Sequence, residues 1–270
     1  MRKFFQGLIA LGGFALLWYL EQAHPLRPNT LQKKKRALTN SGLAIAGATT
    51  IAVCNYFIVR RTVRIADRKR IGLLNRIPLP GWARRIAALL LLDYTLYWWH
   101  RMNHEAGDLW RFHNVHHTDL DMDSTTSIRF HFGELALSIL FRTIQVALIG
   151  AQAVDLMVFD NFLLVAIRFH HSNLRLGRWD RRIQWLVVTP EMHGIHHSLV
   201  LEETNSNWST IFSFWDRIHG TLKTGIPPSE ITIGVPAYRD PEELTLPELV
   251  VMPFHPQRPW ALPDGSAPKR

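Results

Sequence analysis

The chain has 270 residues, a formal net charge of +9 and 47% hydrophobic residues, which allows one large domain or two small ones. Its single cysteine, Cys54, excludes a disulfide framework and a thiolate metal site, so nitrogen or oxygen atoms must hold any metal. The positive charge does not indicate a nucleic-acid-binding protein, because the basic residues cluster at the ends of apolar blocks, where membrane proteins face anionic headgroups.

Five apolar blocks follow one another along the chain, and each predicts a helix. A bilayer core requires about 20 apolar residues in a helix, with a range of about 17–25. One block reaches that length without a charged residue, and the others are shorter or carry a polar residue. Because so many blocks share one chain, membrane helices are favoured over buried helices of a soluble bundle. The blocks are residues 4–20, 37–59, 82–99, 135–149 and 154–169.

Residues 1–80 are predicted to be an N-terminal membrane anchor of two helices and a basic connector. The block 4–20 resembles a signal peptide, but no small-residue cleavage site follows it, so we expect an uncleaved anchor. The basic run 60–70 keeps apolar residues at a rough helical spacing and is expected to lie along the membrane interface. Two prolines and a glycine in residues 78–81 should end the helix.

Residues 81–222 are predicted to be the catalytic domain, because they contain twelve of the fourteen histidines. Residues 223–270 contain ten of the fifteen prolines and little periodicity, which predicts an extended tail that is wrapped on the domain or partly disordered. The predicted fold class is all-α: a polytopic membrane helical bundle with a cytosolic, histidine-rich helical cap.

The blocks 135–149 and 154–169 are separated by four residues, so they predict a helical hairpin. Its two ends return to the same side of the molecule. The hairpin would therefore bring residues 170–171 back to the face that residues 113–117 occupy.

Histidines recur at spacings typical of metal ligands. One segment places two imidazoles at i and i+4, and two further segments place three each at i, i+3 and i+4, so the rings of each segment can point into one cavity. One ion takes about three to six ligands, so eight or nine imidazoles predict two ions. Imidazole suits zinc, copper, iron and nickel alike. The predicted ligands are His100, His104, His113, His116, His117, His171, His193, His196 and His197.

Four other histidines are interpreted differently. His24 and His255 lie outside any cluster, and His219 is interpreted as a packing or hydrogen-bonding residue. His170 fits either role, and we favour His171 of that pair as the ligand.

The three histidine segments resemble those of the fatty acid hydroxylase/sterol desaturase superfamily of membrane di-iron oxygenases. The resemblance covers about residues 72–222. It implies a helical membrane protein whose catalytic side is cytoplasmic, and which holds two irons and oxidises C–H bonds of lipids with dioxygen. No cytochrome b5-like segment or dinucleotide motif is visible, so the resemblance implies a separate electron donor such as cytochrome b5 or ferredoxin. The matching stretches are His100-Arg101-x-x-His104, 109–119, His171-Ser172-Asn173, His193-x-x-His196-His197 and 207–221.

Acidic residues near the clusters are candidates to orient a ligand, because metal-bound imidazoles usually donate their second N–H to an acceptor. Asp93 lies seven residues before His100, on nearly the same helical face. Glu105, Asp119 and Glu134 are weaker candidates for the same role.

One departure from the family's pattern concerns His131. The family often has Arg-x-His-Pro-x-Glu after its second cluster, whereas this chain reads Arg129-Phe130-His131-Phe132-Gly133-Glu134. Because the proline is missing, His131 is expected to support a ligand rather than to be one.

The sequence therefore predicts a membrane-bound di-iron oxygenase that hydroxylates or desaturates a fatty acyl, sterol-like or ether lipid. The segment His104-Glu105 is similar to the alkylglycerol monooxygenase branch, which keeps an ether lipid among the candidates. One alternative is a membrane zinc hydrolase, although such enzymes usually carry a glutamate inside the motif, as in HExxH. A non-catalytic metal transporter or sensor is the other alternative, and it predicts histidines within the spans. The oligomeric state is left open.

The membrane topology also has two solutions. If the block 82–99 spans the bilayer, the basic residues 60–76 lie opposite the catalytic side, against the positive-inside trend. A re-entrant or interfacial block would remove the conflict.

Overall fold

The computed structural model describes residues 2–28 and 33–270, with side chains from residue 12 onward. These residues form helices connected by loops and contain no strand, although three isolated β-bridges join loop segments. The described chain is therefore all-helical, as the sequence predicts.

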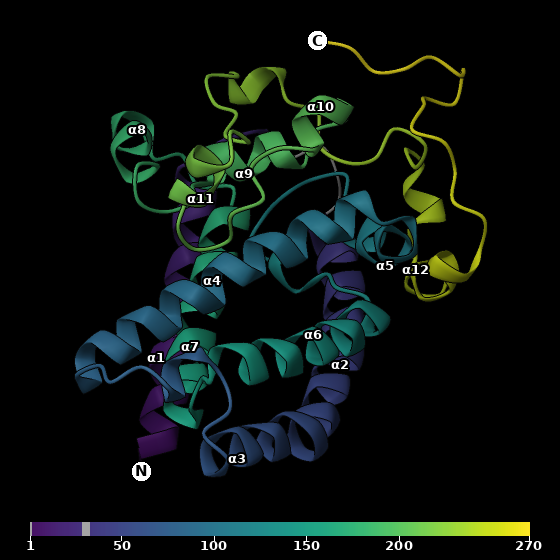
Figure 1. Cartoon of the computed structure of the whole chain (residues 1–270). Helices are drawn as coiled ribbons and strands as arrows, with labels where there is room; N and C mark the ends of the chain where they lie inside the picture. Colours follow the sequence, from purple (N-terminus) through teal and green to yellow (C-terminus); the bar gives the residue numbers. More distant parts are fainter. Residues whose placement is uncertain (1, 29–32) are drawn as a thin grey trace.

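The five apolar blocks all lie in long helices (Figure 1). Helix α2 continues without a break through the π-helical segment η1 (Asn55–Val59) into α3 (Arg60–Arg68), which crosses the lower end of the molecule. Arg168 of α7 lies over the ring of Phe14, so α1 and α7 are in contact. The long helices are α1 (Arg2–Ala23), α2 (Lys33–Cys54), α4 (Gly81–Glu105), α6 (Phe132–Ile149) and α7 (Ala153–His171).

The predicted hairpin is formed by α6 and α7. Gly150 ends α6 in the left-handed region with φ of 77°, a conformation that favours glycine. Gln152 and Asp155 then form a capping box that starts α7. Arg84 of α4 donates to Asp155 at 2.8 Å and to the Gly150 carbonyl at 2.6 Å. The tip of the hairpin is thereby fixed to α4.

The main apolar core lies between α3, α4, α6 and α7. Its fully buried residues include Leu92, Val146 and Phe159, which lie on faces that the helical period directs inward. This core holds together the helices that carry the polar cap, and Ile211 of the cap belongs to it.

Short helices and loops make up the cap and the tail. They include α5 (Gly107–His117), α8 (Asp180–Ile183), α9 (Pro190–His196), α10 (Leu201–Thr204), α11 (Phe214–Ile218) and α12 (Leu246–Val251). Short 3-10 helices lie at Leu73–Asn75, Thr126–Ile128, Gly177–Trp179, Pro228–Glu230, Pro241–Glu243 and Met252–Phe254.

The tail after residue 222 is packed on the rest of the protein. Leu249 of α12 is buried in one cluster with Leu43 of α2 and Val115 of α5. The Trp260 indole N–H donates to the Leu199 carbonyl at 2.8 Å. The predicted domain boundaries at residues 80 and 222 stay predictions, since segments on both sides of them pack together.

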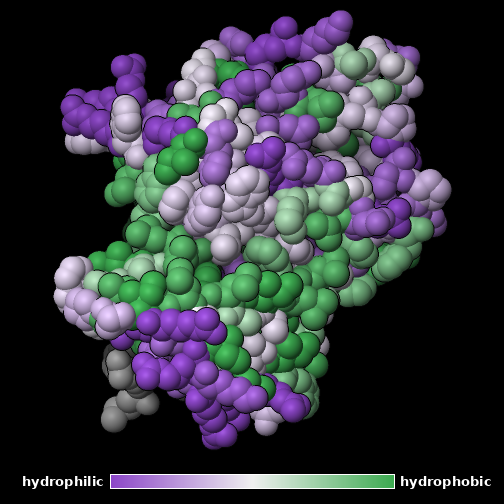
Figure 2. All heavy atoms as spheres, viewed as in Figure 1, coloured by the Kyte–Doolittle hydropathy of each residue, from purple (hydrophilic) through white to green (hydrophobic). Residues whose placement is uncertain are grey.

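On the face seen in Figure 2, an apolar band crosses the lower half of the molecule between the polar cap and a polar lower rim. Two helical stretches, Lys33–Asn75 and Phe132–Ile149, are long and apolar enough to cross a membrane. The outward faces of α6 and α7 expose Leu140, Ile144, Leu148, Met157, Phe162 and Val165. These surfaces associate the protein with a membrane.

Candidate metal centre

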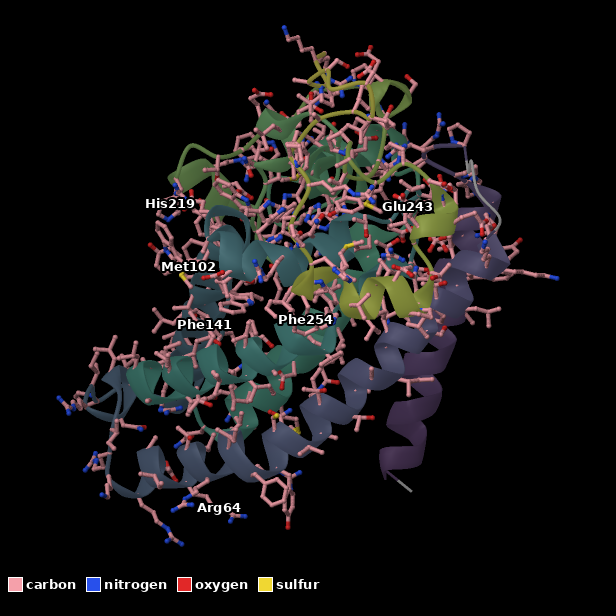
Figure 3. All side chains as sticks on the ribbon, turned by 90° about the vertical axis from the view of Figure 1, so that its right-hand side faces the viewer. Arg64, Met102, Phe141, His219, Glu243 and Phe254 are labelled. Atoms are coloured by element: carbon pink, nitrogen blue, oxygen red, sulfur yellow. The ribbon has the colours of Figure 1, made fainter. Side chains whose placement is uncertain are left out.

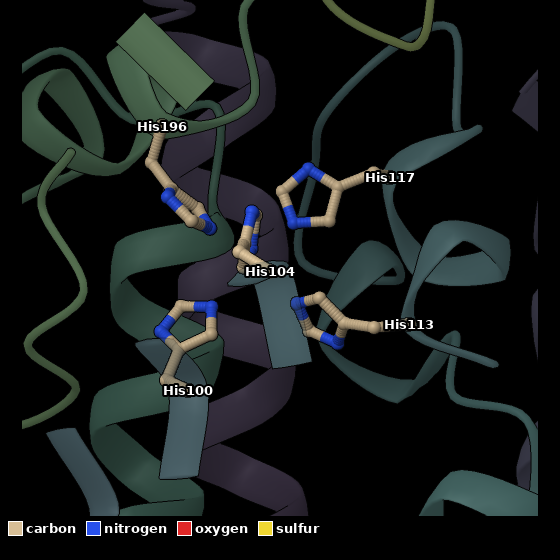
Figure 4. Close-up of side chains that lie close together, drawn as sticks. All are labelled: His100, His104, His113, His117 and His196. Atoms are coloured by element: carbon tan, nitrogen blue, oxygen red, sulfur yellow. The ribbon is translucent and has the colours of Figure 1, made fainter. Parts of the chain in front are cut away.

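Five histidines from three helices converge on one point, and we call them the five-histidine group (Figure 4). One nitrogen of each ring lies within 4.8 Å of a nitrogen of every other ring. The members are His100 and His104 of α4, His113 and His117 of α5, and His196 of α9.

A second set, the four-histidine group, lies beside the first. Nε2 of His171 is 3.0 Å from Nε2 of His116 and 2.9 Å from Nε2 of His193. Nε2 of His197 is 3.2 Å from Nε2 of His193. Neutral imidazoles arranged in this way point lone pairs at one another, and a cation among them would convert the repulsion into attraction.

The helical period explains why neighbouring histidines serve different groups. Successive residues of an α-helix point about 100° apart, whereas residues four apart point only about 40° apart. On α5, His113 and His117 are four apart and face the five-histidine group, and His116 faces the other. On α9, His193 and His197 are four apart and face the four-histidine group, and His196 faces the other. Both groups thus take members from the same two short helices.

Hydrogen bonds from the second nitrogen fix the orientation of several rings. Nδ1 of His113 donates to Glu134 at 2.9 Å. The other acceptors are backbone carbonyls: Trp208 for His100 at 2.9 Å, Ser206 for His196 at 2.8 Å, Arg129 for His116 at 3.2 Å and Ile167 for His171 at 2.8 Å. A proton on Nδ1 leaves the Nε2 lone pair directed toward the centre of each group.

The donor set fits metal ions. Within the described part of the chain, buried Nε2 atoms without any hydrogen-bond partner belong to His104, His113, His117 and His196 of the five-histidine group, and to His219 outside it. Burial and then the neighbouring His113 lower the pKa of His100 to about 3, and burial lowers the pKa of His171 to about 4. These two imidazoles are therefore neutral at physiological pH, which is the form that binds a cation.

The structure brings all nine predicted ligands into these two groups, and their role as ligands stays a prediction. It adds His170, whose ring centroid lies 4.1 Å from that of His193. Nδ1 of His170 donates to the Thr210 carbonyl at 3.1 Å, an arrangement like that of the other rings. The sequence favoured His171 over its neighbour, but the end of α7 delivers both side chains to the site.

His131 is not positioned to support a ligand. Its Nδ1 accepts the backbone N–H of Gly133 at 2.9 Å, which caps the N-terminus of α6, and its Nε2 contacts the Val250 carbonyl at 3.1 Å. His219 stacks on Tyr97 with ring centroids 4.9 Å apart.

The expected role of Asp93 in orienting an imidazole directly is wrong. Its carboxylate accepts the backbone N–H groups of Ile211 at 3.2 Å and Phe212 at 3.1 Å, and the Trp215 indole N–H at 2.8 Å. Asp93 thus holds the loop at residues 208–212, whose carbonyls accept hydrogen bonds from His100 and His170. Asp93 therefore acts on the predicted ligands through this loop and does not contact them.

The three weaker acidic candidates have different partners in the structure. Glu134 is the carboxylate that contacts a ligand, whereas Glu105 is exposed and pairs with Arg101 at 2.7 Å. Asp119 pairs with the buried Arg36 at 2.7 Å. Most of the groups that accept hydrogen bonds from the imidazoles are backbone carbonyls. Every residue has a backbone carbonyl, so the sequence could not identify which ones would take this role.

A comparison with known protein families shows to which of them this chain is related. The model of a family described as fatty acid hydroxylase matches residues 85–221, just over half of the chain. The chain belongs to the fatty acid hydroxylase family. The nine histidines of the two groups, and His170 beside them, all lie inside the matched residues of this fatty acid hydroxylase homologue.

Several curated relatives are named for the lipids on which they act. An ornithine lipid hydroxylase of Rhizobium tropici is 32% identical over 152 residues, covering 56% of this chain and 45% of the relative. An alkylglycerol monooxygenase of Xenopus tropicalis is 30% identical, with 48% and 28% covered. Human cholesterol 25-hydroxylase is 29% identical, with 52% of each chain covered. The chain therefore spans about half the length of these relatives or less. No solved structure matches it.

Proposed function

We propose that this protein is a membrane-bound di-iron oxygenase that hydroxylates or desaturates a lipid with dioxygen and electrons from a separate protein. The observation that carries the proposal is the pair of adjacent imidazole groups, each with Nε2 atoms directed inward. Two groups of four to five nitrogen ligands suit two transition-metal ions better than one.

The protein's own residues would bind and orient the ions. Members of the five-histidine group would hold one ion and members of the four-histidine group the other, with His170 beside the latter. When bound, iron supplies the activation of dioxygen that C–H oxidation needs. The buried cage excludes water, and the acceptors at Nδ1 keep five of the rings in the tautomer that binds metal, those of His100, His113, His116, His171 and His196.

A lipid is the proposed substrate class. The relatives are named for ornithine lipid, alkylglycerol and cholesterol, which differ in headgroup and backbone but all reside in membranes. The exposed apolar faces of α6 and α7 would place the protein in the compartment to which such substrates partition.

We further propose a polytopic arrangement in which α6 and the α2–α3 stretch cross the bilayer and α1, α4 and α7 accompany them. Exposed aromatic residues of the kind found at membrane interfaces lie near helix ends, with Trp18 in the last two turns of α1 and Trp82 at the start of α4. The basic residue Arg64 lies at the opposite end of the molecule from His219 (Figure 3).

The cap is proposed to face the cytoplasm, as the family resemblance implies. Basic residues flank both ends of the apolar band, Lys33–Arg36 at the cap and the arginines of α3 at the far end, so the positive-inside trend does not select one orientation. A cytoplasmic cap would give a donor such as cytochrome b5 or ferredoxin access to the metals.

The test compares lipids from cells that lack the protein, cells that express it and cells that express His116→Ala. The native chain should yield an oxidised lipid only when oxygen is present, and the purified protein should contain iron. His255→Ala is the matched control, since His255 lies outside both groups. Oxidised lipid from His116→Ala at the native level would contradict the proposal, as would a native protein that contains zinc and acts without oxygen.

A further inference from the structure

Residues 21–28 and 33–40, which precede the matched residues 85–221, contact the segments that carry the four-histidine group. They come from the end of α1 and the beginning of α2. The contacts are buried and polar, unlike those expected of a simple membrane anchor.

Glu21 joins two of these segments. It is 1% exposed, and its carboxylate accepts the backbone N–H of Asn173 at 3.1 Å. The same carboxylate accepts the backbone N–H of Ser124 at 3.0 Å and the Ser124 hydroxyl at 2.8 Å. Asn173 follows the ligand His171 by two residues, so Glu21 fixes the turn by which the chain leaves that ligand.

The residues after Glu21 continue the contact. Asn173 exchanges side-chain and backbone hydrogen bonds with Arg27 at 2.9 and 2.8 Å, and its carbonyl accepts the N–H of Leu26 at 2.8 Å. The Arg27 guanidinium packs on Gly194, where an added Cβ would come within 2.3 Å of it. Gly194 directly follows His193, a second member of the four-histidine group.

Helix α2 reaches a third member through Arg129. The Arg129 guanidinium donates to the Asn40 side chain at 2.9 Å and to the Val115 carbonyl at 2.9 Å. The Arg129 carbonyl in turn accepts a hydrogen bond from Nδ1 of His116 at 3.2 Å. Residues 21–28 and 33–40 thus contact the surroundings of three of the four rings.

The five-histidine group is supported differently. The acceptors for its rings are the Glu134 carboxylate and the carbonyls of Trp208 and Ser206, and all three lie inside residues 85–221. Each group therefore has its own set of supporting residues.

We propose that Glu21 is a positioning residue for the four-histidine group, so that the N-terminal helices of this chain help the family domain to hold one of its two metal sites, whereas the supports of the other come from the family domain. This inference rests on the proposed two-metal centre. Loss of the Glu21 carboxylate would weaken one ion selectively, because the Asn173 N–H in the turn after His171 and the N–H and hydroxyl of Ser124 would lose their acceptor, while the supports of the five-histidine group stay in place.

The test titrates the metal-free full-length protein in detergent with cobalt(II) and follows its ligand-field spectrum. The native chain should bind two ions. Glu21→Gln should weaken one binding event by about ten- to a hundredfold and leave the other unchanged, as loss of a residue that orients a ligand does. Glu134→Gln should weaken the other event, and the double variant should weaken both.

The control is Glu242→Gln, which removes an exposed ion pair with Lys35 and should leave both affinities unchanged. Ser124→Ala removes only the hydroxyl that Glu21 accepts, and it should weaken the same ion by a smaller factor even if Glu21→Gln does not fold. Two ions bound at native affinity by either variant of the Glu21 contact would overturn the inference, and so would a double variant that weakens only one. A native chain that binds no cobalt would overturn the two-metal centre itself.

Discussion

His116 and His117 are adjacent in the chain, yet their rings belong to different groups, with centroids 5.4 Å apart and planes at 89°. The alternation follows from the helical period and recurs at His196 and His197, whose centroids are also 5.4 Å apart. The two proposed ions are therefore neighbours that share the helices holding them.

Replacing either of these neighbours should remove a different ion. We expect His116→Ala and His117→Ala each to retain about one iron per chain and to lose activity by at least about 100-fold, since even residues that only orient ligands contribute about 10–100-fold. Metal analysis of the purified variants measures this. Retention of two irons by both variants would contradict the assignment of the groups, and His24→Ala provides the control.

Removing the Asp93 carboxylate should loosen the loop that supports His100 and His170. Asp93→Asn puts an amide where three N–H donors converge, and each buried group left unsatisfied costs about 1–3 kcal/mol. We expect a lower unfolding temperature and weaker metal binding, measured by thermal unfolding and metal titration. Asp108→Asn, at an exposed position on α5, should leave both quantities nearly unchanged.

The stability of the metal-free protein should fall as the pH is lowered. Burial lowers the pKa values of His100 to about 3 and of His171 to about 4, whereas the unfolded chain titrates near pH 6.5. Below about pH 6.5 the unfolded state takes up protons that the folded state does not, so folding becomes less favourable until the pH approaches the folded pKa values. Thermal unfolding between pH 8 and pH 5 measures the loss, and a flat profile would contradict the burial of neutral rings.

Gly194→Ala should destabilise the cap. The new methyl group would collide with the buried Arg27 guanidinium, and overpacking of this kind costs about 1–3 kcal/mol. Denaturant unfolding of the metal-free protein measures the change. Gly107→Ala, where a Cβ meets nothing within 4 Å, is the matched control, and an equal effect of the two substitutions would rule out the collision.

A charge on the outward face of α6 should impair membrane insertion. Ile144 is 55% exposed within the apolar band, and an arginine at the centre of a membrane helix costs about 2.5–3.5 kcal/mol. We expect a larger fraction of Ile144→Arg to be extracted from membranes by alkaline carbonate. Ile218→Arg, at an exposed position on the cap, should stay with the membrane as the native chain does.

The sequence could predict the helices and the nine candidate ligands because both depend on local periodicity. The hairpin of α6 and α7 followed from four intervening residues, and it brings His171 to 3.0 Å from His116 as expected. The supports of the rings were less accessible. Asp93 was expected to contact an imidazole because of its helical spacing from His100. Its carboxylate instead accepts hydrogen bonds from N–H groups of the loop before α11.

Long-range contacts account for the remaining differences. The role of Glu21 depends on how the end of α1 meets a turn more than 150 residues away, which no local pattern encodes. Glu134 was only a weak candidate, although it is the carboxylate that reaches a ligand, because its distance from His113 depends on how α5 crosses the start of α6.

Helix α9 has seven residues and carries His193 and His196, with His197 at its end. A helix of two turns has almost no intrinsic stability in water, so its order depends on what surrounds it. Metal bound by these histidines should therefore add to the stability of the cap during biogenesis. In a cell short of the ion the cap would open to proteases more often, and the supply of the metal would influence how much of the protein persists.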